Sequence, residues 1–276
     1  MGADFGDIDH DGKLDIFVTN FTEEPDTLYR NLGTQGFADI SWNAGIAQPT
    51  YPYVGWGTAF FDMDNDGWDD IFVANGHVYP QMDQVKGGVP YRQPLQLLRN
   101  KRDKTFQDVT ALSGLDKLPL QSRRGAAFGD VNNDGKVDVL LMNVGEPPTL
   151  LLNRTESSNH AVLFKLVGSK SNKAAIGARV TVTAGDLTQF REVRAGTSYL
   201  SQNDLRLHFG LGAQTSMNAV EVAWPSGIKE RYSDLPGDTI YTIVEGTGVT
   251  EKTPLSGQSV AASASPSVAK KAASIK

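Results

Sequence analysis

Three stretches of the sequence carry aspartates at one fixed spacing, and carboxylates spaced in this way bind cations. Each stretch reads Asp-x-Asp/Asn-x-Asp-Gly-x-x-Asp and runs into an apolar segment with β-strand character. Two carboxylates ~4–5 Å apart repel by about 3–4 kcal/mol at an effective dielectric constant of ~20. A divalent cation removes that cost, and Ca²⁺ accepts roughly six to eight oxygen ligands in a flexible geometry. The spacing therefore predicts three calcium-binding loops and up to three Ca²⁺ ions.

We expect each loop to hold its ion with side-chain oxygens and one backbone carbonyl. The side chains belong to the first, third, fifth and ninth positions and the carbonyl to the seventh. The glycine at the sixth position allows a tight bend. The predicted ligands are Asp7, Asp9, Asp11, Lys13 and Asp15 in the first loop, Asp62, Asp64, Asp66, Trp68 and Asp70 in the second, and Asp130, Asn132, Asp134, Lys136 and Asp138 in the third.

Other interpretations of these loops fit the residues less well. A single copy could be an ordinary turn, because Asp and Gly favour turns, but three copies before the same type of strand favour calcium. The loops differ from EF-hands, whose twelfth position carries a bidentate glutamate; here it carries Val18, Val73 and Leu141. Magnesium demands strict octahedral geometry and retained water. Because Asn132 replaces an aspartate, we expect the third loop to bind more weakly than the loop at Asp62.

The loops belong to longer repeats that predict the fold. After the first two loops come a Leu-x-Arg-Asn run, a Phe-x-Asp strand and a Gly-containing turn, over residues 28–46 and 97–115; residues 150–153 begin the same run and then leave the pattern. Each unit offers short strands between turn signals and no helical period. All-β units with one acidic loop each fit β-propeller blades. We therefore expect an all-β chain whose residues 1–158 form a partial propeller of about two to three blades.

The remainder of the chain has a different character. Alternating polar and apolar residues over 159–246 predict a small antiparallel β domain without acidic loops. Residues 247–276 are rich in Ser, Ala, Pro and Lys, which predicts a disordered tail. An insertion at residues 76–94, rich in Gly, Pro and aromatic residues, predicts a surface loop that contacts a partner or packs locally.

Composition excludes several classes of protein. The formal net charge of −6 argues against nucleic-acid binding, which needs a concentrated basic face. The chain has no cysteine, so disulfides, thiolate metal sites and cysteine nucleophiles are ruled out. No apolar run approaches the ~18 residues of a transmembrane segment. The chain starts within a repeat and shows no signal peptide, so we expect upstream propeller blades to be missing from it.

The same motifs resemble known families. The acidic loops resemble FG-GAP/VCBS repeats, the calcium-loop blades also found in integrin α-chain propellers. A later group of motifs resembles the ASPIC/UnbV domain, and the combination is similar to the cartilage acidic protein family, which has many bacterial members. The resemblance implies an extracellular or periplasmic location, calcium binding and a role in adhesion or matrix contact, without catalytic residues. The ASPIC/UnbV-like motifs lie at Asn172, 176–180, 198–202, 207–212 and 224–227.

We expect a binding or adhesion module for a protein or glycan ligand, with structural calcium and no enzymatic activity. The sequence has no nucleophile elbow, phosphate-binding glycine loop or HExxH motif. Two alternatives stay open: a polysaccharide-active or other envelope enzyme with a site near residues 76–94, and a structural scaffold of an envelope complex. An enzyme predicts a pocket in which acids outside the three loops converge with shifted pKa values. A binding module predicts a broad exposed aromatic or charged face.

Several single residues are expected to have structural roles. His77 is expected to make a structural hydrogen bond and His208 to pack within its strand. Asp69 and Asp103 are expected to be solvated charges. The tryptophans are expected to pack between blades or sheets rather than to stack on a sugar; they are Trp42, Trp56, Trp68 and Trp224.

Overall fold

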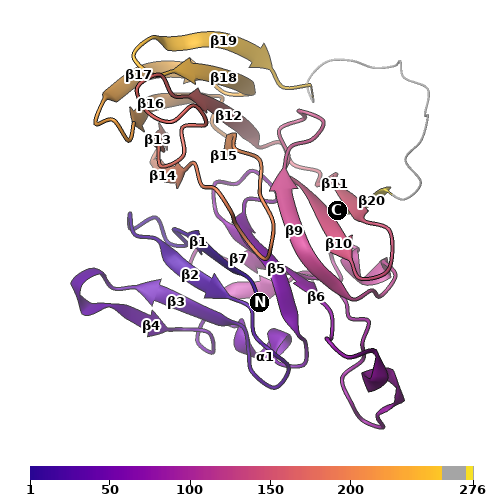
Figure 1. Cartoon of the computed structure of the whole chain (residues 1–276). Coiled ribbons are helices and arrows are strands. Elements are labelled where there is room, and N and C mark those ends of the chain that lie inside the picture. Colours follow the sequence, from indigo (N-terminus) through magenta and orange to yellow (C-terminus); the bar gives the residue numbers. More distant parts are fainter. Residues whose placement is uncertain (257–271, 276) are drawn as a thin grey trace, which may run out of the picture.

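The computed structural model describes residues 1–256 and 272–275 and consists of strands with a few short helical turns (Figure 1). Within this described part, the strands form five four-stranded sheets. The all-β class and the propeller-type arrangement are therefore confirmed. The expected number of about two to three blades is lower than the five four-stranded sheets observed. Three of these sheets contain the acidic loops, and residues beyond 158 add the other two. The helical turns are η1 (Gly33–Gln35), α1 (Ala47–Thr50), η2 (Pro80–Gln84) and η3 (Leu115–Lys117).

Three of the sheets carry the acidic loops, and we call them blades 1, 2 and 3. Blades 1 and 2 are antiparallel meanders, whereas the fourth strand of blade 3 is β20, which pairs in parallel with β11. In each blade the acidic loop joins the first strand to the second. Blade 1 comprises β1 (Ala3–Gly6), β2 (Asp15–Val18), β3 (Thr27–Asn31) and β4 (Phe37–Asp39). Blade 2 comprises β5 (Gly55–Phe61), β6 (Asp70–Asn75), β7 (Gln96–Asn100) and β8 (Phe106–Asp108). Blade 3 comprises β9 (Arg123–Gly129), β10 (Asp138–Asn143), β11 (Thr149–Asn153) and β20 (Ala272–Ile275).

Blade 2 is buried on both faces because side chains along a strand alternate between the two faces of a sheet. Phe60 and Ile71 belong to a core shared with blade 1. Phe61 and Phe72 belong to a core shared with blade 3, where Phe72 lies 5.7 Å from Phe128 between ring centroids. This double burial explains why the strands of blade 2 are almost continuously apolar.

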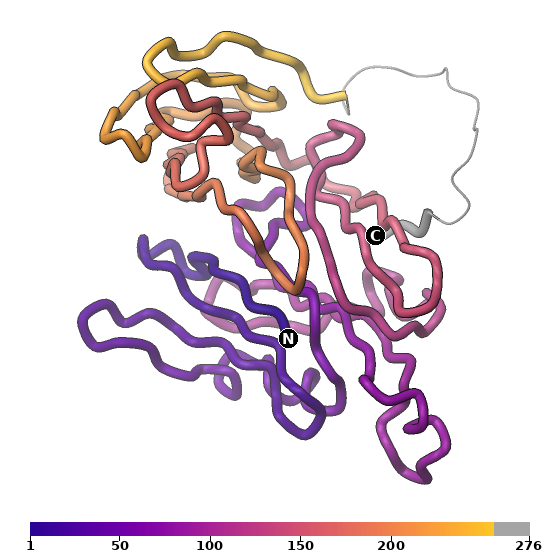
Figure 2. The backbone as a smooth tube through the Cα atoms, in the orientation of Figure 1, coloured from indigo at the N-terminus to yellow at the C-terminus, as the bar shows by residue number. Residues whose placement is uncertain are grey.

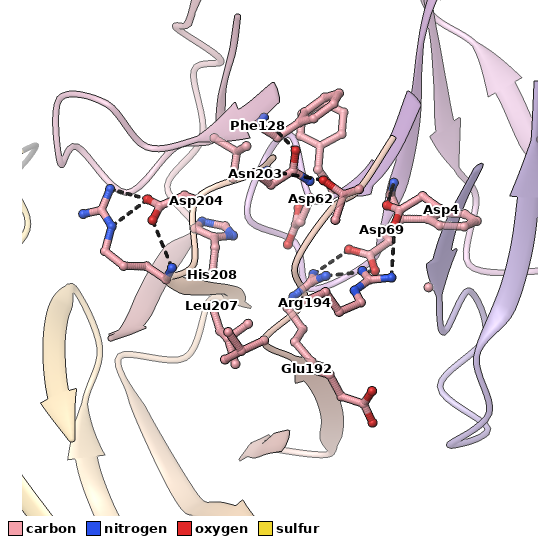
Figure 3. Close-up of a pocket in the computed structure, with 18 of the residues that line it drawn as sticks. Asp4, Asp62, Asp69, Phe128, Glu192, Arg194, Asn203, Asp204, Leu207 and His208 are labelled. Carbon is pink, nitrogen blue, oxygen red and sulfur yellow. Dashed lines mark hydrogen bonds and ion pairs between the residues drawn. The ribbon is translucent and has the colours of Figure 1, made fainter. Parts of the chain in front are cut away.

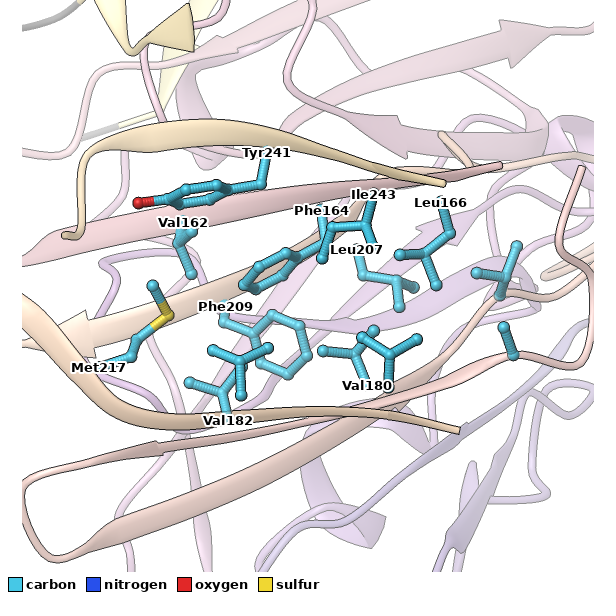
Figure 4. Packing of buried hydrophobic residues seen from close by; sticks show 14 of the residues in the cluster. Val162, Phe164, Leu166, Val180, Val182, Leu207, Phe209, Met217, Tyr241 and Ile243 are labelled. Carbon is cyan, nitrogen blue, oxygen red and sulfur yellow. The ribbon is translucent and has the colours of Figure 1, made fainter. Parts of the chain in front are cut away.

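The last two sheets pack face to face around one core and form a second domain (Figure 4). Phe164 lies at its centre, 5.8 Å from Phe209 and 5.7 Å from Tyr241 between ring centroids. One sheet has the order β15-β12-β18-β19 and the other β14-β13-β16-β17. The strands are β12 (His160–Val167), β13 (Arg179–Ala184), β14 (Leu187–Glu192), β15 (Leu207–Gly212), β16 (Ser216–Ala223), β17 (Lys229–Pro236), β18 (Thr239–Val244) and β19 (Gly248–Pro254).

Two expectations about this region need correction. The domain is not wholly antiparallel, because β12 and β18 pair in parallel, whereas β15 on the other side of β12 is antiparallel to it. The predicted disordered tail cannot begin at residue 247, because β19 extends the same sheet by pairing with β18. The rest of that predicted tail, residues 257–271 and 276, lies outside the described residues.

The insertion at residues 76–94 projects from the end of blade 2 as a loop that contains η2 (Figure 2). Its base is held by Arg123 of blade 3, whose guanidinium is buried. Arg123 Nη1 donates to the Gln93 carbonyl at 2.9 Å, and Nη2 donates to the Pro119 carbonyl at 2.9 Å. Burial lowers the pKa of Arg123 to about 10. The insertion is thus anchored at its base, whereas Tyr79 near its start is 59% exposed.

We predict that Phe72→Ala destabilises the fold by about 3–5 kcal/mol, because it leaves a cavity between blades 2 and 3. Leu112→Ala is the matched control: Leu112 is 76% exposed, so its truncation should change the free energy of unfolding by less than about 0.5 kcal/mol. Urea unfolding followed by tryptophan fluorescence measures both. Equal losses in the two variants would contradict the assigned core.

Candidate metal centres

Hydrogen bonds within each acidic loop give the loop its shape. In the loop of blade 2, the Asp62 carboxylate accepts the backbone N–H groups of Asp66 at 3.1 Å and Gly67 at 2.7 Å. The Asp70 carboxylate accepts the N–H of Met63 at 3.1 Å. The same bonds recur in the loops of blades 1 and 3. The first and ninth positions therefore fix the backbone as well as supplying oxygens.

Two positions of each loop adopt left-handed backbone conformations. In blade 2 these are Asn65, with φ of 60°, and Gly67, with φ of 88°. Gly tolerates this region without a steric penalty, and Asn tolerates it better than most residues. The repeated glycine at the sixth position thus has a conformational cause. The equivalent residues are His10 and Gly12 in blade 1 and Asn133 and Gly135 in blade 3.

Three carboxylates converge in each of the first two loops, from the first, third and ninth positions. Within a set, one oxygen of each residue lies within 4.8 Å of the others. At the third position, Oδ1 of Asp9 and of Asp64 is buried without a hydrogen-bond partner. An unpaired buried carboxylate oxygen is costly, and a cation among the three carboxylates would satisfy it. The residues present therefore fit a hard cation; the sets are Asp7, Asp9 and Asp15, and Asp62, Asp64 and Asp70.

The other oxygen of each third-position aspartate pairs with an arginine. Arg99 Nη2 lies 2.5 Å from Asp64 Oδ2, and Arg30 Nη2 lies 2.6 Å from Asp9 Oδ2. Both arginines come from the repeated Leu-x-Arg-Asn run. The fifth-position aspartates also meet basic groups, since Asp66 pairs with Arg102 at 2.7 Å. These ion pairs reduce the repulsion within each cluster.

The loop of blade 3 differs at two linked positions. Asn132 takes the place of the third-position aspartate, and Leu152 takes the place of the arginine that would pair with it. The Asn132 side-chain amide donates to Asp134 at 2.9 Å. Among the described residues, the converging sets of three carboxylates lie in blades 1 and 2. The loop of blade 3 therefore lacks both the third-position carboxylate and the arginine that pairs with it in blades 1 and 2.

Burial raises the pKa of the loop carboxyl groups. The pKa values of Asp7, Asp15 and Asp130 rise to about 6, with desolvation as the main cause. Those of Asp62 and Asp70 rise well above the ordinary value, because burial is deeper and a neighbouring carboxylate adds repulsion. The charged form of each loop is therefore disfavoured unless a cation compensates it.

An asparagine at the end of the third strand completes each loop, and its role was not expected. The backbone N–H groups of Asn31, Asn100 and Asn153 donate to the ninth-position aspartate of their own blade at 2.7–2.8 Å. The side-chain amides of two of them also reach the preceding blade. Asn100 Nδ2 donates to the Ile8 carbonyl at 3.1 Å, and Asn153 Nδ2 donates to the Met63 carbonyl at 2.8 Å. In the sequence, an asparagine ends the run that follows each loop, and this recurrence could have indicated its role.

Asp69 joins the blades to the second domain, so the expectation that it is a solvated charge was wrong. It is only 7% exposed. Arg191 of β14 contacts both of its oxygens, at 2.5 and 3.1 Å. The pair is bidentate, which is a strong and directional arrangement. Asp69 is the eighth residue of the loop of blade 2, so this loop is fixed to the second domain.

The second domain also covers the loops directly. A Cβ atom on Gly210 of β15 would lie 1.9 Å from Asp62 Oδ2, so only glycine fits against this carboxylate. His208 of the same strand is hydrogen-bonded through Nε2 to the Gly135 carbonyl at 2.9 Å, and burial lowers its pKa to about 4. His208 is therefore packed, as expected. The loop of blade 2 is enclosed between blade 3 and the second domain.

A pocket lies between the first strands of the blades and the second domain (Figure 3). The segment between β14 and β15 lines it and reaches blade 3, where Phe128 N–H donates to Asn203 at 3.1 Å. Asp4 is buried there; desolvation raises its pKa, and Arg194, 3.0 Å away, opposes the rise. No residue of the insertion at 76–94 lines this pocket.

The tryptophans and His77 differ in how they are placed. His77 Nδ1 accepts the Tyr79 N–H at 3.1 Å, which is the expected structural hydrogen bond. The Arg124 guanidinium lies over the Trp56 ring at 4.3 Å, and Trp68 meets the His10 ring edge to face with 4.3 Å between centroids, so both tryptophans are packed. Trp224 is 4% exposed, whereas Trp42 is 66% exposed, so the expected packing was wrong for Trp42.

We predict that Asn100→Ala lowers the free energy of unfolding by about 1–3 kcal/mol, because it leaves the buried Ile8 and Asp69 carbonyls without their donor. Asn31→Ala is the control, since Asn31 is half-buried and its amide bonds only within blade 1. Both variants keep the backbone N–H. Urea unfolding should show the larger loss for Asn100→Ala; equal losses would mean that the contact between blades adds nothing.

The metal-free protein should become more stable as the pH falls from about 6 to 4. The folded-state pKa values of Asp7 and Asp130, about 6, lie above the unfolded value near 4. Folding therefore takes up protons in this window, and the stabilisation is lost as the pH rises through about 6. Thermal melts in chelator at pH 5 and pH 7.5 measure the effect. Asp7→Asn combined with Asp130→Asn should make it smaller without abolishing it, because Asp15, Asp62 and Asp70 also have raised pKa values; an unchanged slope would refute the assignment.

Two family models match the chain. The FG-GAP-like repeat matches residues 5–73, which span the loops of blades 1 and 2, and the ASPIC and UnbV model matches residues 168–250 in the second domain. Cartilage acidic protein 1 of Homo sapiens is 27% identical over 82% of this chain, and that of Mus musculus is 25% identical over 82%. The chain covers 33% and 42% of these two relatives.

A second kind of relative matches a shorter part of the chain. Integrin alpha-3 of Cricetulus griseus is 32% identical over 98 residues, which are 34% of this chain and 8% of the integrin. The matches agree with the motifs in the acidic loops and the second domain. The chain therefore contains an FG-GAP-like repeat followed by an ASPIC and UnbV segment, and most of it is similar to cartilage acidic protein 1.

Proposed function

We propose that this chain is a calcium-stabilised binding or adhesion module that works outside the cell or in the periplasm. The observation that carries the metal assignment is the pair of buried carboxylate clusters in blades 1 and 2, each with an unpaired Oδ1. All side-chain ligands offered are oxygens, which hard cations prefer. Extracellular modules bind calcium at roughly 10⁻⁴–10⁻³ M, which suits an ion whose role is structural.

The proposed calcium ions would fasten each acidic loop to the strands beside it. Asp62 and Asp70 already accept backbone N–H groups at the two ends of their loop. An ion between them would neutralise buried charge and hold β5 and β6 together. In this chain without cysteine, such ions would take over part of the stabilising role that disulfides have elsewhere.

The binding role is supported by the relatives and by exposed aromatic side chains. The matched relatives are cartilage acidic protein 1 and integrin alpha-3, and we extend an adhesion role to this chain by that similarity. Tyr79 on the insertion is 59% exposed and Trp42 on blade 1 is 66% exposed. Aromatic side chains of this kind are enriched where proteins bind partners. We propose a protein or glycan ligand and no catalytic activity.

The residues that the structure describes include no helix with the length and apolar character to cross a bilayer. The extracellular or periplasmic location is proposed from the similarity to the two relatives and from the calcium-type loops.

We predict that calcium raises the melting temperature and that a chelator lowers it at pH 7.5. Asp64→Ala should remove most of the heat of calcium binding to blade 2, because it deletes the unpaired Oδ1. Isothermal titration calorimetry compares this variant with Asp130→Asn in blade 3. Because the wild-type loop of blade 3 is expected to bind calcium more weakly, Asp130→Asn should cause the smaller loss of heat. Asp103→Asn, an exposed aspartate outside the loops, is the control. A melting temperature unaffected by chelator would refute structural calcium, and equal losses in the two loop variants would refute the ranking.

A further inference from the structure

The second domain is seated on the acidic loops of blades 2 and 3. Figure 1 shows β14 and β15 on the side of this domain that faces the blades. On blade 3, His208 Nε2 is hydrogen-bonded to the Gly135 carbonyl at 2.9 Å, and Arg206 Nη1 donates to Asn133 Oδ1 at 2.5 Å. Among the described residues, the hydrogen bonds of the loop of blade 1 stay within the blades. The loop of blade 1 therefore has the same ligand pattern as that of blade 2 but lies outside this interface.

The contacts on the loop of blade 2 depend on the path of its backbone. Gly212 N–H donates to the Asn65 carbonyl at 2.9 Å. The Leu187 side chain of β14 lies against Gly67, since a Cβ atom on Gly67 would come within 2.4 Å of Leu187 Cδ2. Asn65 and Gly67 are the two residues of this loop with left-handed backbone conformations. Both contacts therefore require the loop to keep its shape.

Docking of the second domain also buries negative charge. Gly210 lies directly against Asp62 Oδ2, and Asp62 is 0% exposed. The two backbone N–H groups that Asp62 accepts offset part of its charge, but Asp64 and Asp70 add two further carboxylates to the cluster. Burial of charge that is not compensated is costly. The second domain should therefore dock less favourably on an empty loop than on a loop that holds a cation.

We propose that calcium in the loop of blade 2 strengthens the docking of the second domain, so that ion binding and docking stabilise each other. This inference rests on the proposed function, because it needs an ion among Asp62, Asp64 and Asp70. The coupling is reciprocal: docking raises the affinity of the loop for the ion by the same factor by which the ion favours docking. The calcium concentration around the protein would thereby set how firmly the two domains are joined.

Hydrogen–deuterium exchange of the full chain, measured by mass spectrometry, tests the effect of the ion on docking. A chelator at pH 7.5 should raise the exchange rate in β14 and β15 by roughly fivefold or more, with a smaller change in β17 at the opposite edge of the β14 sheet. Asp64→Ala should show the faster exchange even in calcium, whereas Asp9→Ala, the equivalent change in blade 1, should not. Equal exchange with and without calcium, or equal effects of the two variants, would overturn the coupling.

Calcium titration calorimetry tests the effect of docking on the ion. The titrations use Asp9→Ala as background, because blade 1 then contributes little heat. Adding Leu187→Ala should raise the dissociation constant of the blade 2 site by roughly fivefold or more, although Leu187 supplies no ligand. Ile176→Ala is the control, since it truncates an exposed aliphatic side chain of the same domain outside β14 and β15. Circular dichroism confirms that each variant is folded, and a dissociation constant unchanged by Leu187→Ala would overturn the coupling.

The outcomes separate this inference from the proposed function. If calcium gives no heat of binding and no shift in melting temperature, both are overturned. If calcium binds and raises the melting temperature while exchange in β14 and β15 stays the same, the proposed function stands and the coupling between the ion and the second domain is overturned.

Discussion

Burial of carboxylate charge is the constraint on which the rest of this structure depends. The first and ninth aspartates of each loop accept backbone N–H groups and so give the loop its shape, as Asp62 and Asp70 show. That hydrogen bonding brings the carboxylates together while the surrounding strands exclude water. The resulting repulsion is reduced by arginines from the third strand and, in our proposal, by calcium. The acidic loops are therefore sites of unfavourable buried charge and also the points where the first two strands of each blade are joined.

The same loops connect neighbouring parts of the molecule. Asn100 binds blade 2 to the acidic loop of blade 1, and Asn153 binds blade 3 to the acidic loop of blade 2. Arg191 of the second domain pairs with Asp69, the eighth residue of the loop of blade 2. Apolar packing between blades supplies the area, and these polar contacts fix the register. Loss of a single loop is therefore expected to disturb two interfaces as well as one metal centre.

Sequence reasoning predicted what depends on local spacing. The acidic loops, their glycines, the strands after them and the division into blades and a second β domain all follow from short motifs. It did not predict Asp69, because nothing near Asp69 in the chain indicates that Arg191 will reach it. It also ended the second domain too early, because β19 is exposed and polar along much of its length and joins the sheet only through pairing with β18. The role of the third-strand asparagines was missed because their second partner lies in the preceding blade.

The glycine at position 210 has a kinetic consequence. Its backbone lies against the carboxylate of Asp62, which is 0% exposed. A cation held in the loop of blade 2 therefore has no direct path to solvent on that side while the second domain is docked. The loop of blade 1, where Asp11 and Gly12 are exposed, has no such cover, so ions held by the same ligand pattern in the two loops would leave at different rates.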